Sequence, residues 1–237
     1  MIKLFTFLQR RPELAHGEFR DRWSDFGERL LEVPELAALV RRYVQNRAIQ
    51  GAAVPELTLS GFDGAGELWF DSLHDLESAV RLPAYRAAIA SDEARFADPG
   101  CTIRLAAEES PQFDRGFGEV KFIGLSKRSA EFATREDWIR YWIDAHGPLA
   151  HGIPEFTRYY GKYVHNYVLP SDAGSGGLTP AFDGIVEEWL VSVEDFGHCL
   201  AEPAYLELVR PDEIKFVDFA GSHMMVTEEH VVLAGSS

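Results

Sequence analysis

The sequence predicts an α+β protein made of two tandem ferredoxin-like (βαββαβ) repeats, whose antiparallel sheets pack into an intramolecular pseudo-dimeric α+β barrel. Three observations support this prediction. The chain repeats itself, with Phe62–Ser72 matching Phe182–Ser192 at an offset of 120 residues. Each copy carries the same order of strand-like and helix-like segments. The composition, 46% hydrophobic and 26% charged over 237 residues, is that of a globular chain long enough for two ordinary cores.

The duplication covers nearly the whole chain. Pairs of identical residues at the offset of 120 include Pro34 with Pro154, Tyr43 with Tyr163, Asn46 with Asn166, Pro83 with Pro203, and Asp92 with Asp212. Upstream, the offset falls to 119 at Trp23 and Trp142, and to 118 at Lys3 and Lys121. We expect these two steps to be small insertions in loops of the second copy.

The two copies span residues 1–110 and 118–230 and are joined by Ser110–Phe117. Their strands are short, mostly apolar runs with aromatic and β-branched residues, a composition typical of buried strands. The predicted strands are residues 2–8, 43–47, 66–70 and 102–107 in copy one, and 120–126, 159–168, 185–191 and 222–227 in copy two. Residues 170–180 are rich in Gly, Ser and Pro and are predicted to form a surface loop.

Two helical regions separate the strands in each copy. Residues 16–31 and 133–145 place apolar residues three and four positions apart, as on one face of an amphipathic helix. Thr134 is a suitable N-cap for the second of these helices, and Gly147 with Pro148 is expected to end it. The later helices are predicted to start near residues 73 and 193, with further helical segments opened by Pro83 and Pro203.

The order β-α-β-β-α-β places both helices of a copy on one face of an antiparallel sheet. The other face of the sheet must also be buried, and the sheet of the second copy can pack against it within the same chain. We therefore expect the two sheets to face each other in a barrel, with the helices outside.

Both copies resemble EthD-type domains of the dimeric α+β barrel superfamily. The shared motifs are a Tyr-Val-x-Asn strand, a Phe-Asp-Gly-x-x-Glu-x-Trp strand and, in copy two, Trp-x-x-x-His-Gly-Pro-Leu at Trp142–Leu149. The resemblance implies small cofactor-independent proteins linked to catabolism or tailoring of organic and aromatic compounds. Copy one departs from the last motif at Phe26 and Gly27, which implies an active site in copy two and a supporting role for copy one.

The charge balance excludes some classes of function. With 38 acidic and 23 basic residues the formal net charge is −15, which opposes nucleic-acid binding driven by phosphate neutralisation. The sequence shows no long apolar run that could span a membrane, and its start does not resemble an export signal. Cys101 and Cys199 lack metal-type spacing. We expect a cytoplasmic protein without nucleic-acid or membrane partners.

His146 is the first candidate for a catalytic residue. It lies four residues after Trp142 on an apolar helical stripe, and Gly27 stands near this place in copy one. A partly buried imidazole can move a proton near neutral pH. The alternative is a core histidine that caps a carbonyl at the helix end. We expect Glu187 or His165 to orient the ring of His146, although Glu187 could equally make a structural hydrogen bond.

Aromatic and polar residues near this stretch are candidates for substrate binding, because aromatic walls with a few polar tips suit a flat organic ligand. Ordinary core packing is the alternative for the aromatic residues. Asn166 could be structural, because copy one has an asparagine, Asn46, at the same position. These candidates are Tyr141, Trp142, His151, Tyr160, Tyr163, Asn166 and Trp189. A metal site at the histidines is a weaker hypothesis, since their spacing matches no common ligand motif; we predict none.

These residues predict a cofactor-independent enzyme of the lyase, isomerase or cyclase type, which acts by His-mediated proton transfer on a small aromatic or related organic compound. No Gly-rich nucleotide loop and no Gly-x-Ser-x-Gly motif is present. Two alternatives remain: a non-catalytic small-molecule-binding protein of a degradation pathway, and a haem- or metal-binding barrel. A homodimer of such pseudo-dimeric chains is a candidate assembly.

Overall fold

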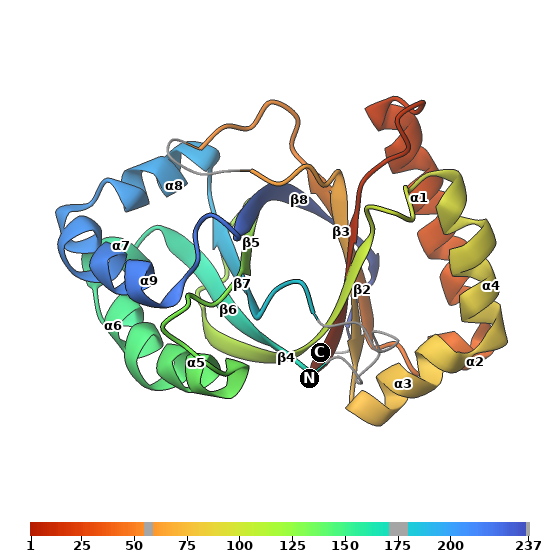
Figure 1. The fold of residues 1–237 in the computed structure, drawn as a ribbon. Coiled ribbons are helices and arrows are strands. Elements are labelled where there is room, and N and C mark those ends of the chain that lie inside the picture. The colour runs from red at the N-terminus through yellow and green to blue at the C-terminus, as the bar shows by residue number, and fades with distance from the viewer. Residues whose placement is uncertain (55–58, 171–179, 236–237) are drawn as a thin grey trace.

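The computed structural model describes residues 1–54, 59–170 and 180–235. In this part of the chain, eight strands form one closed antiparallel barrel in the order β1-β3-β2-β8-β5-β7-β6-β4 (Figure 1). The strands are β1 (Ile2–Leu8), β2 (Arg42–Ala48), β3 (Gly64–Phe70), β4 (Ile103–Asp114), β5 (Val120–Ser126), β6 (Tyr160–Val168), β7 (Gly184–Leu190) and β8 (His223–Leu233). The predicted fold of two repeats in one α+β barrel is confirmed.

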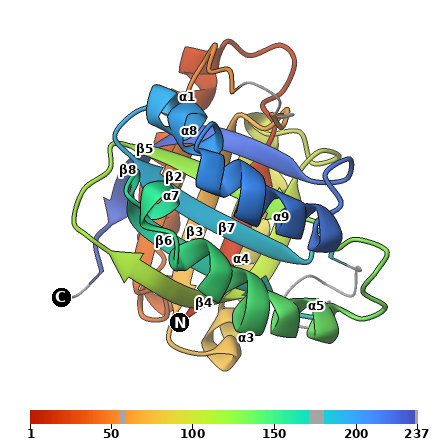
Figure 2. The same cartoon turned by 90° about the vertical axis from the view of Figure 1, so that its left-hand side faces the viewer.

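The helices lie outside the barrel, on two opposite sides (Figures 1 and 2). Copy one has α1 (His16–Leu31), α2 (Pro34–Ala37), α3 (Leu73–Arg81), α4 (Pro83–Ser91) and a 3-10 turn, η1 (Glu93–Arg95). Copy two has α5 (Arg135–Tyr141), η2 (Trp142–His146), α6 (Gly147–His151), α7 (Pro154–Thr157), α8 (Val193–Leu200), η3 (Tyr205–Val209) and α9 (Arg210–Phe216), of which η2 and η3 are π-helical. None of the described helices is long and apolar enough to cross a membrane.

The last strand of each copy is much longer than predicted and joins the two copies. Strand β4 pairs first with β1 and then, from Ala107 to Asp114, with β6 of the other copy. Strand β8 pairs in the same way with β5 and then with β2. The Ser110–Phe117 segment, predicted as a linker, is therefore strand as far as Asp114. Its polar composition hid pairing that only the tertiary fold supplies, and most of the predicted 170–180 loop lies outside the described residues.

The glycine of the repeated Phe-Asp-Gly motif allows a tryptophan to lie on the sheet. A Cβ atom at Gly184 would come within 2.3 Å of the Trp142 ring, and one at Gly64 would come equally close to Trp23. Any larger residue would push the ring outward. Both copies therefore keep this glycine for packing, and in copy two it seats Trp142 close to the barrel wall.

The barrel interior contains a buried ionic cluster with near two-fold symmetry. Lys3 Nζ contacts Glu187 and lies 3.4 Å from Glu67 Oε2. Lys121 Nζ lies 2.5 Å from Glu67 Oε1 and 2.6 Å from Glu187 Oε1. Burial would raise the pKa of Glu187, but Lys121 and Lys3 hold it well below its ordinary value. Further hydrogen bonds in the cluster come from Asn46 to Glu67, Asn166 to Glu187, Trp69 to Glu109 and Trp189 to Glu229.

Replacing Glu187 by Gln should destabilise the barrel by about 3–5 kcal/mol, because two buried ammonium groups would lose a shared counter-charge. Urea unfolding followed by circular dichroism measures this loss. Glu229→Gln is the matched control, since its carboxylate is partly exposed and lies 3.3 Å from Lys121, so it should cost less. Equal losses of stability in the two variants would contradict the view that Glu187 is the more important counter-charge of the buried lysines.

Candidate active site

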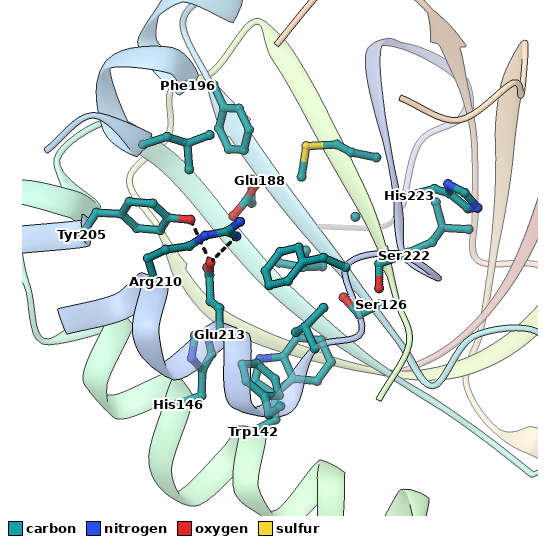
Figure 3. Close-up of a pocket in the computed structure, with 18 of the residues that line it drawn as sticks. Ser126, Trp142, His146, Glu188, Phe196, Tyr205, Arg210, Glu213, Ser222 and His223 are labelled. Carbon is teal, nitrogen blue, oxygen red and sulfur yellow. Dashed lines mark hydrogen bonds and ion pairs between the residues drawn. The ribbon is translucent and has the colours of Figure 1, made fainter. Parts of the chain in front are cut away.

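A cavity of about 360 Å³ lies between the copy-two sheet and its helices (Figure 3). Its floor is formed by β5, β6, β7 and the start of β8, and its walls come from η2, α7, α8, η3 and α9. Aromatic rings dominate the walls, and several polar side chains reach the same space. The aromatic lining residues are Trp142, Phe156, Tyr160, Tyr163, Phe196, Tyr205, Phe216 and Phe219; the polar ones are Ser126, His146, Glu188, Arg210, Glu213, Ser222 and His223.

A π-helical turn carries His146 into this cavity. The turn, η2, follows α5 without a break and continues into α6, so the helix extends past Gly147 and Pro148 to His151. The predicted end of the helix was wrong: Pro148 lies where the π-helical turn passes into α6, and the helix continues through it to His151. Copy one has an ordinary α-helix here, α1, whose equivalent stretch is one residue shorter.

His146 forms a hydrogen-bonded pair with Asp212 of α9. Its Nδ1 lies 3.0 Å from Asp212 Oδ2, and the hydroxyl of Tyr141 donates to the other carboxylate oxygen. Because a carboxylate only accepts hydrogen bonds, Nδ1 carries the proton in this pair. The ring also packs against Phe216, with centroids 4.4 Å apart. Nε2 is then the ring nitrogen left to accept a proton.

Burial lowers the pKa of His146, and the hydrogen bond and charge of Asp212 only partly oppose this shift. The shift favours the neutral imidazole, which carries its lone pair on Nε2 when Nδ1 donates to Asp212. A neutral, oriented imidazole at the wall of an apolar cavity is suited to act as a general base.

Glu188 projects from β7 into the same cavity and is only 5% exposed. Burial, followed by the charge of Glu213, raises its pKa to about 8, although hydrogen bonds from the hydroxyls of Tyr163 and Tyr160 act in the opposite direction. Its Oε2 atom has no hydrogen-bond partner among the described residues. Glu188 is thus a buried carboxylic acid that keeps its proton at neutral pH.

Glu213 of α9 is the second carboxyl group at this end of the cavity. Its Oε2 accepts a hydrogen bond of 2.7 Å from Tyr205 and lies 3.4 Å from Arg210 NH1 (Figure 3). Burial raises its pKa to about 7, while Tyr205 and Arg210 lower it. Arg210 is therefore already engaged by a carboxyl group of the protein.

Replacing Glu188 by Gln should make the stability of the fold less dependent on pH. The folded chain holds a proton on Glu188 between about pH 4.5 and pH 8, which the unfolded chain releases, so the wild-type protein loses stability as pH rises through this window. The loss should reach a few kcal/mol, at no more than about 1.4 kcal/mol per pH unit. Urea unfolding at the two ends of the window compares the variant with wild type and with the exposed-site control Glu194→Gln. An equal loss in all three proteins would contradict this assignment.

The structure brings four of the predicted site residues to the cavity. His146, Trp142, Tyr160 and Tyr163 line it, and Tyr141 stands behind His146 as a partner of Asp212. These four residues stay candidates for the site, and the cavity is where the structure brings them together.

Five other predicted site residues lie elsewhere. Glu187, Asn166 and Trp189 point into the barrel, on the opposite face of the sheet, so Glu187 binds the buried lysines and not His146. His165 stacks on Trp142, with centroids 4.4 Å apart, and His151 packs beside it at 5.3 Å. Burial lowers the pKa of both histidines, to about 4 for His151. They form a neutral aromatic layer behind the cavity.

Sequence reasoning missed Glu188, Arg210, Asp212 and Glu213, although the repeat carried a signal for two of them. Leu68 stands at the position of Glu188 in copy one, and Ala90 at that of Arg210. The comparison that singled out His146 would have found these two charged residues as well. Asp212 and Glu213 match Asp92 and Glu93 of copy one, so no such contrast marks them.

The corresponding region of copy one holds a cavity of only about 20 Å³. Gln45, which replaces His165, donates to the carbonyl of Trp23, and a Cβ atom on Gly27 would lie 2.6 Å from its Nε2. Glu93 is bound by Arg104. Among the described residues, no group of three or more His, Cys, Asp or Glu side chains is arranged to hold a metal ion.

Comparison with solved structures shows the same fold in proteins of low identity. An anthrone oxidase-like protein has a TM-score of 0.65 at 10% identity, over 99% of this chain and 93% of that chain. A "putative monooxygenase" from Lactobacillus acidophilus NCFM gives 0.57 at 11%, over 100% and 97%. A mutant chlorite dismutase from Candidatus Nitrospira defluvii gives 0.56 at 11%, over 96% and 91%. At such identities the likeness concerns the fold alone.

At the level of sequence, no curated protein matches the chain. The family model for the EthD domain matches it twice, at residues 11–100 and 131–220, one match in each copy. Together the two matches cover most of the chain, and their spacing follows the internal duplication. The protein therefore belongs to the EthD domain family, with two EthD domains forming one dimeric α+β barrel within a single chain.

Proposed function

We propose that this protein is a cofactor-independent enzyme that binds a small aromatic or related organic compound in the copy-two cavity and removes a proton from it with His146. One observation carries the proposal. His146 binds Asp212 through Nδ1, which leaves Nε2 as the basic atom in a cavity walled by aromatic rings. Copy one supports the barrel, and its small cavity is consistent with the absence of a site there.

The geometry gives His146 the features of a general base. Asp212 fixes the tautomer and the ring orientation and stabilises the imidazolium that forms when Nε2 accepts a proton. Tyr141 holds the other oxygen of Asp212, so the carboxylate is constrained from two sides. A base oriented in this way typically accelerates a reaction by about 10²–10⁴-fold.

The cavity walls favour a flat and largely apolar ligand. Trp142, Phe196 and Phe216 offer ring faces and edges, and the volume lies near the lower end of the usual range for small-molecule sites. The protein as a whole is strongly acidic, which gives no attraction for anionic ligands at a distance.

The anion formed by proton removal has two plausible fates. Reprotonation at another atom or loss of a leaving group would give an isomerase, cyclase or lyase. The similar structures called a monooxygenase and an anthrone oxidase-like protein favour a second candidate, in which the anion reacts with dioxygen. A CH₂ group would then become C=O, with one oxygen atom retained and the other released as water, so that no external reductant is required.

Hydrogen exchange tests the proposal directly. A panel of aromatic ketones and phenols is incubated with the protein in D₂O, and loss of the acidic C–H signal is followed by NMR, with dioxygen uptake measured in parallel. Exchange without oxygen uptake supports the isomerase or lyase candidate, and exchange with uptake supports the monooxygenase. Tight binding without exchange would overturn the proposal in favour of an accessory binding protein, and a coloured preparation in favour of a haem or metal protein.

A further inference from the structure

One end of the cavity is built from acidic and phenolic groups that have no part in the proton removal proposed for His146. Glu188 lies on the floor, from β7, with the hydroxyls of Tyr160 and Tyr163 beside its carboxyl group. Its Oε2 atom is buried and has no hydrogen-bond partner among the described residues. A buried polar atom without a partner is costly, and Glu188 lines the cavity, so a ligand bound there can supply the partner once the carboxyl group turns toward it.

The surrounding charges indicate which kind of ligand atom would pair with Oε2 of Glu188. Glu188 and Glu213 repel each other when both are ionised, and Arg210, the cation that lines the cavity, is already bound to Glu213. A carboxylate or phosphate on the ligand would place a full negative charge beside the carboxyl groups of Glu188 and Glu213 in a buried space. A neutral oxygen atom that accepts a hydrogen bond avoids this repulsion, and the protonated carboxyl of Glu188 is able to donate one.

We propose that Glu188 binds the carbonyl oxygen of an uncharged aryl ketone, or a related enolisable carbonyl compound, and stabilises the enolate formed when His146 takes the α-proton. This inference rests on the proposed function and adds the substrate class and a second catalytic residue. The C–H bond breaks and its proton moves to Nε2 of His146. The electron pair becomes the new C=C bond, and the carbonyl oxygen gains the negative charge.

Glu188 keeps its own proton throughout this step, and its hydrogen bond to the oxygen strengthens as the charge grows. A carboxylic acid held neutral by an apolar site is an effective donor to an enolate oxygen, and a donor of this kind typically contributes about 10²–10³-fold to the rate. The hydroxyls of Tyr160 and Tyr163 lie beside this carboxyl group and interact with it.

The first copy offers an internal comparison. At the position of Glu188 it has Leu68, which lines the small cavity of that copy. A leucine is therefore compatible with this strand and this packing environment. Glu188→Leu removes the donor while retaining a side chain that the fold accepts elsewhere in the same molecule.

Substituted 2-naphthols of graded acidity provide the test, because their naphtholate forms mimic an enolate on an aromatic frame and ionisation changes their absorbance. We expect wild-type protein to bind the more acidic naphthols more tightly, and Glu188→Leu to bind them roughly tenfold or more weakly. Glu188→Gln, which keeps an N–H donor, should lie between the two, and Glu194→Gln, at an exposed site, should match wild type.

Two outcomes would overturn the assignment of Glu188: equal affinity of wild type and Glu188→Leu for the naphthols, or no binding of any naphthol to wild type. The His146→Asn variant separates this result from the proposed function. If His146→Asn abolishes hydrogen exchange while Glu188→Leu binds naphthols normally, the base remains and the enolate-binding role of Glu188 is excluded. If His146→Asn retains full exchange, the proposed function itself is excluded.

Discussion

Replacing His146 by Asn should lower kcat/KM by about 10²–10⁴-fold while the thermal unfolding midpoint changes by only a few degrees. The amide nitrogen of Asn occupies nearly the place of Nδ1, so it can still donate to Asp212. The basic Nε2 atom is lost. This variant therefore removes the proposed proton acceptor and retains the hydrogen bond that anchors it.

The pH profile of kcat/KM gives an independent view of the same group. Since burial lowers the pKa of His146, the neutral base should persist to lower pH than an exposed imidazole would, and activity should fall on the acidic side of the profile. If Glu188 acts as the donor, a second fall is expected near pH 8, where it loses its proton. The alkaline fall should disappear in Glu188→Gln.

The matched control is His165→Gln, which introduces the residue that copy one has at Gln45. His165 is buried and stacks on Trp142, but it does not line the cavity. Activity should therefore change much less than in His146→Asn. Comparable losses in the two variants, or unfolding of His146→Asn, would favour a purely structural role for His146.

The fold could be predicted from the sequence because the evidence for it is repeated. Each strand and helix occurs twice, so a weak signal such as the Tyr-Val-x-Asn strand is supported by its copy. What the sequence did not indicate is the exchange of strand ends between the copies. The polar stretch Ser110–Asp114 has little intrinsic strand character, and its partners on β6 are distant in the chain.

The candidate site was only partly predictable, for a reason that the two faces of β7 make clear. Glu187 was predicted to orient the ring of His146, although both copies have a glutamate at this position, and this shared residue serves the shared barrel. Glu188 differs between the copies, and it is the residue that faces the cavity. In a duplicated chain with one site, differences between copies indicate the site better than identities. Asp212 escapes even this criterion, because its role depends on a contact with His146 across 66 positions.

The step in the repeat offset between Trp142 and Pro154 has a structural consequence. It was expected to be a loop insertion, but no loop lies there: the extra residue falls within a continuous helix, whose π-helical turn η2 accommodates it. A π-helical turn of this kind accommodates one extra residue within an α-helix. The side chains within the turn then point in different directions from those of an uninterrupted α-helix. Trp142 and Pro154 can therefore occupy the same places as Trp23 and Pro34 of copy one.

Deleting Ala145, an exposed residue of η2, should restore the helical spacing of copy one and lower activity by about 10²-fold, because a displacement of roughly 1 Å at a catalytic group has effects of this size. The variant should still fold, since α1 has this length in the same barrel. Ala145→Ser, which keeps the chain length, is the control and should remain close to wild type.

A structural readout separates positioning from general damage in the deletion variant. In wild type, NMR titration should show one histidine whose Nδ1–H is held by a carboxylate; in the deletion variant this signal should be lost, while the circular dichroism spectrum and unfolding midpoint stay near those of the control. If the deletion variant keeps both the Asp212 contact and its activity, the π-helical turn is not what positions His146. If both are lost together in a folded protein, one inserted residue explains why this barrel has its base in only one of two otherwise matching halves.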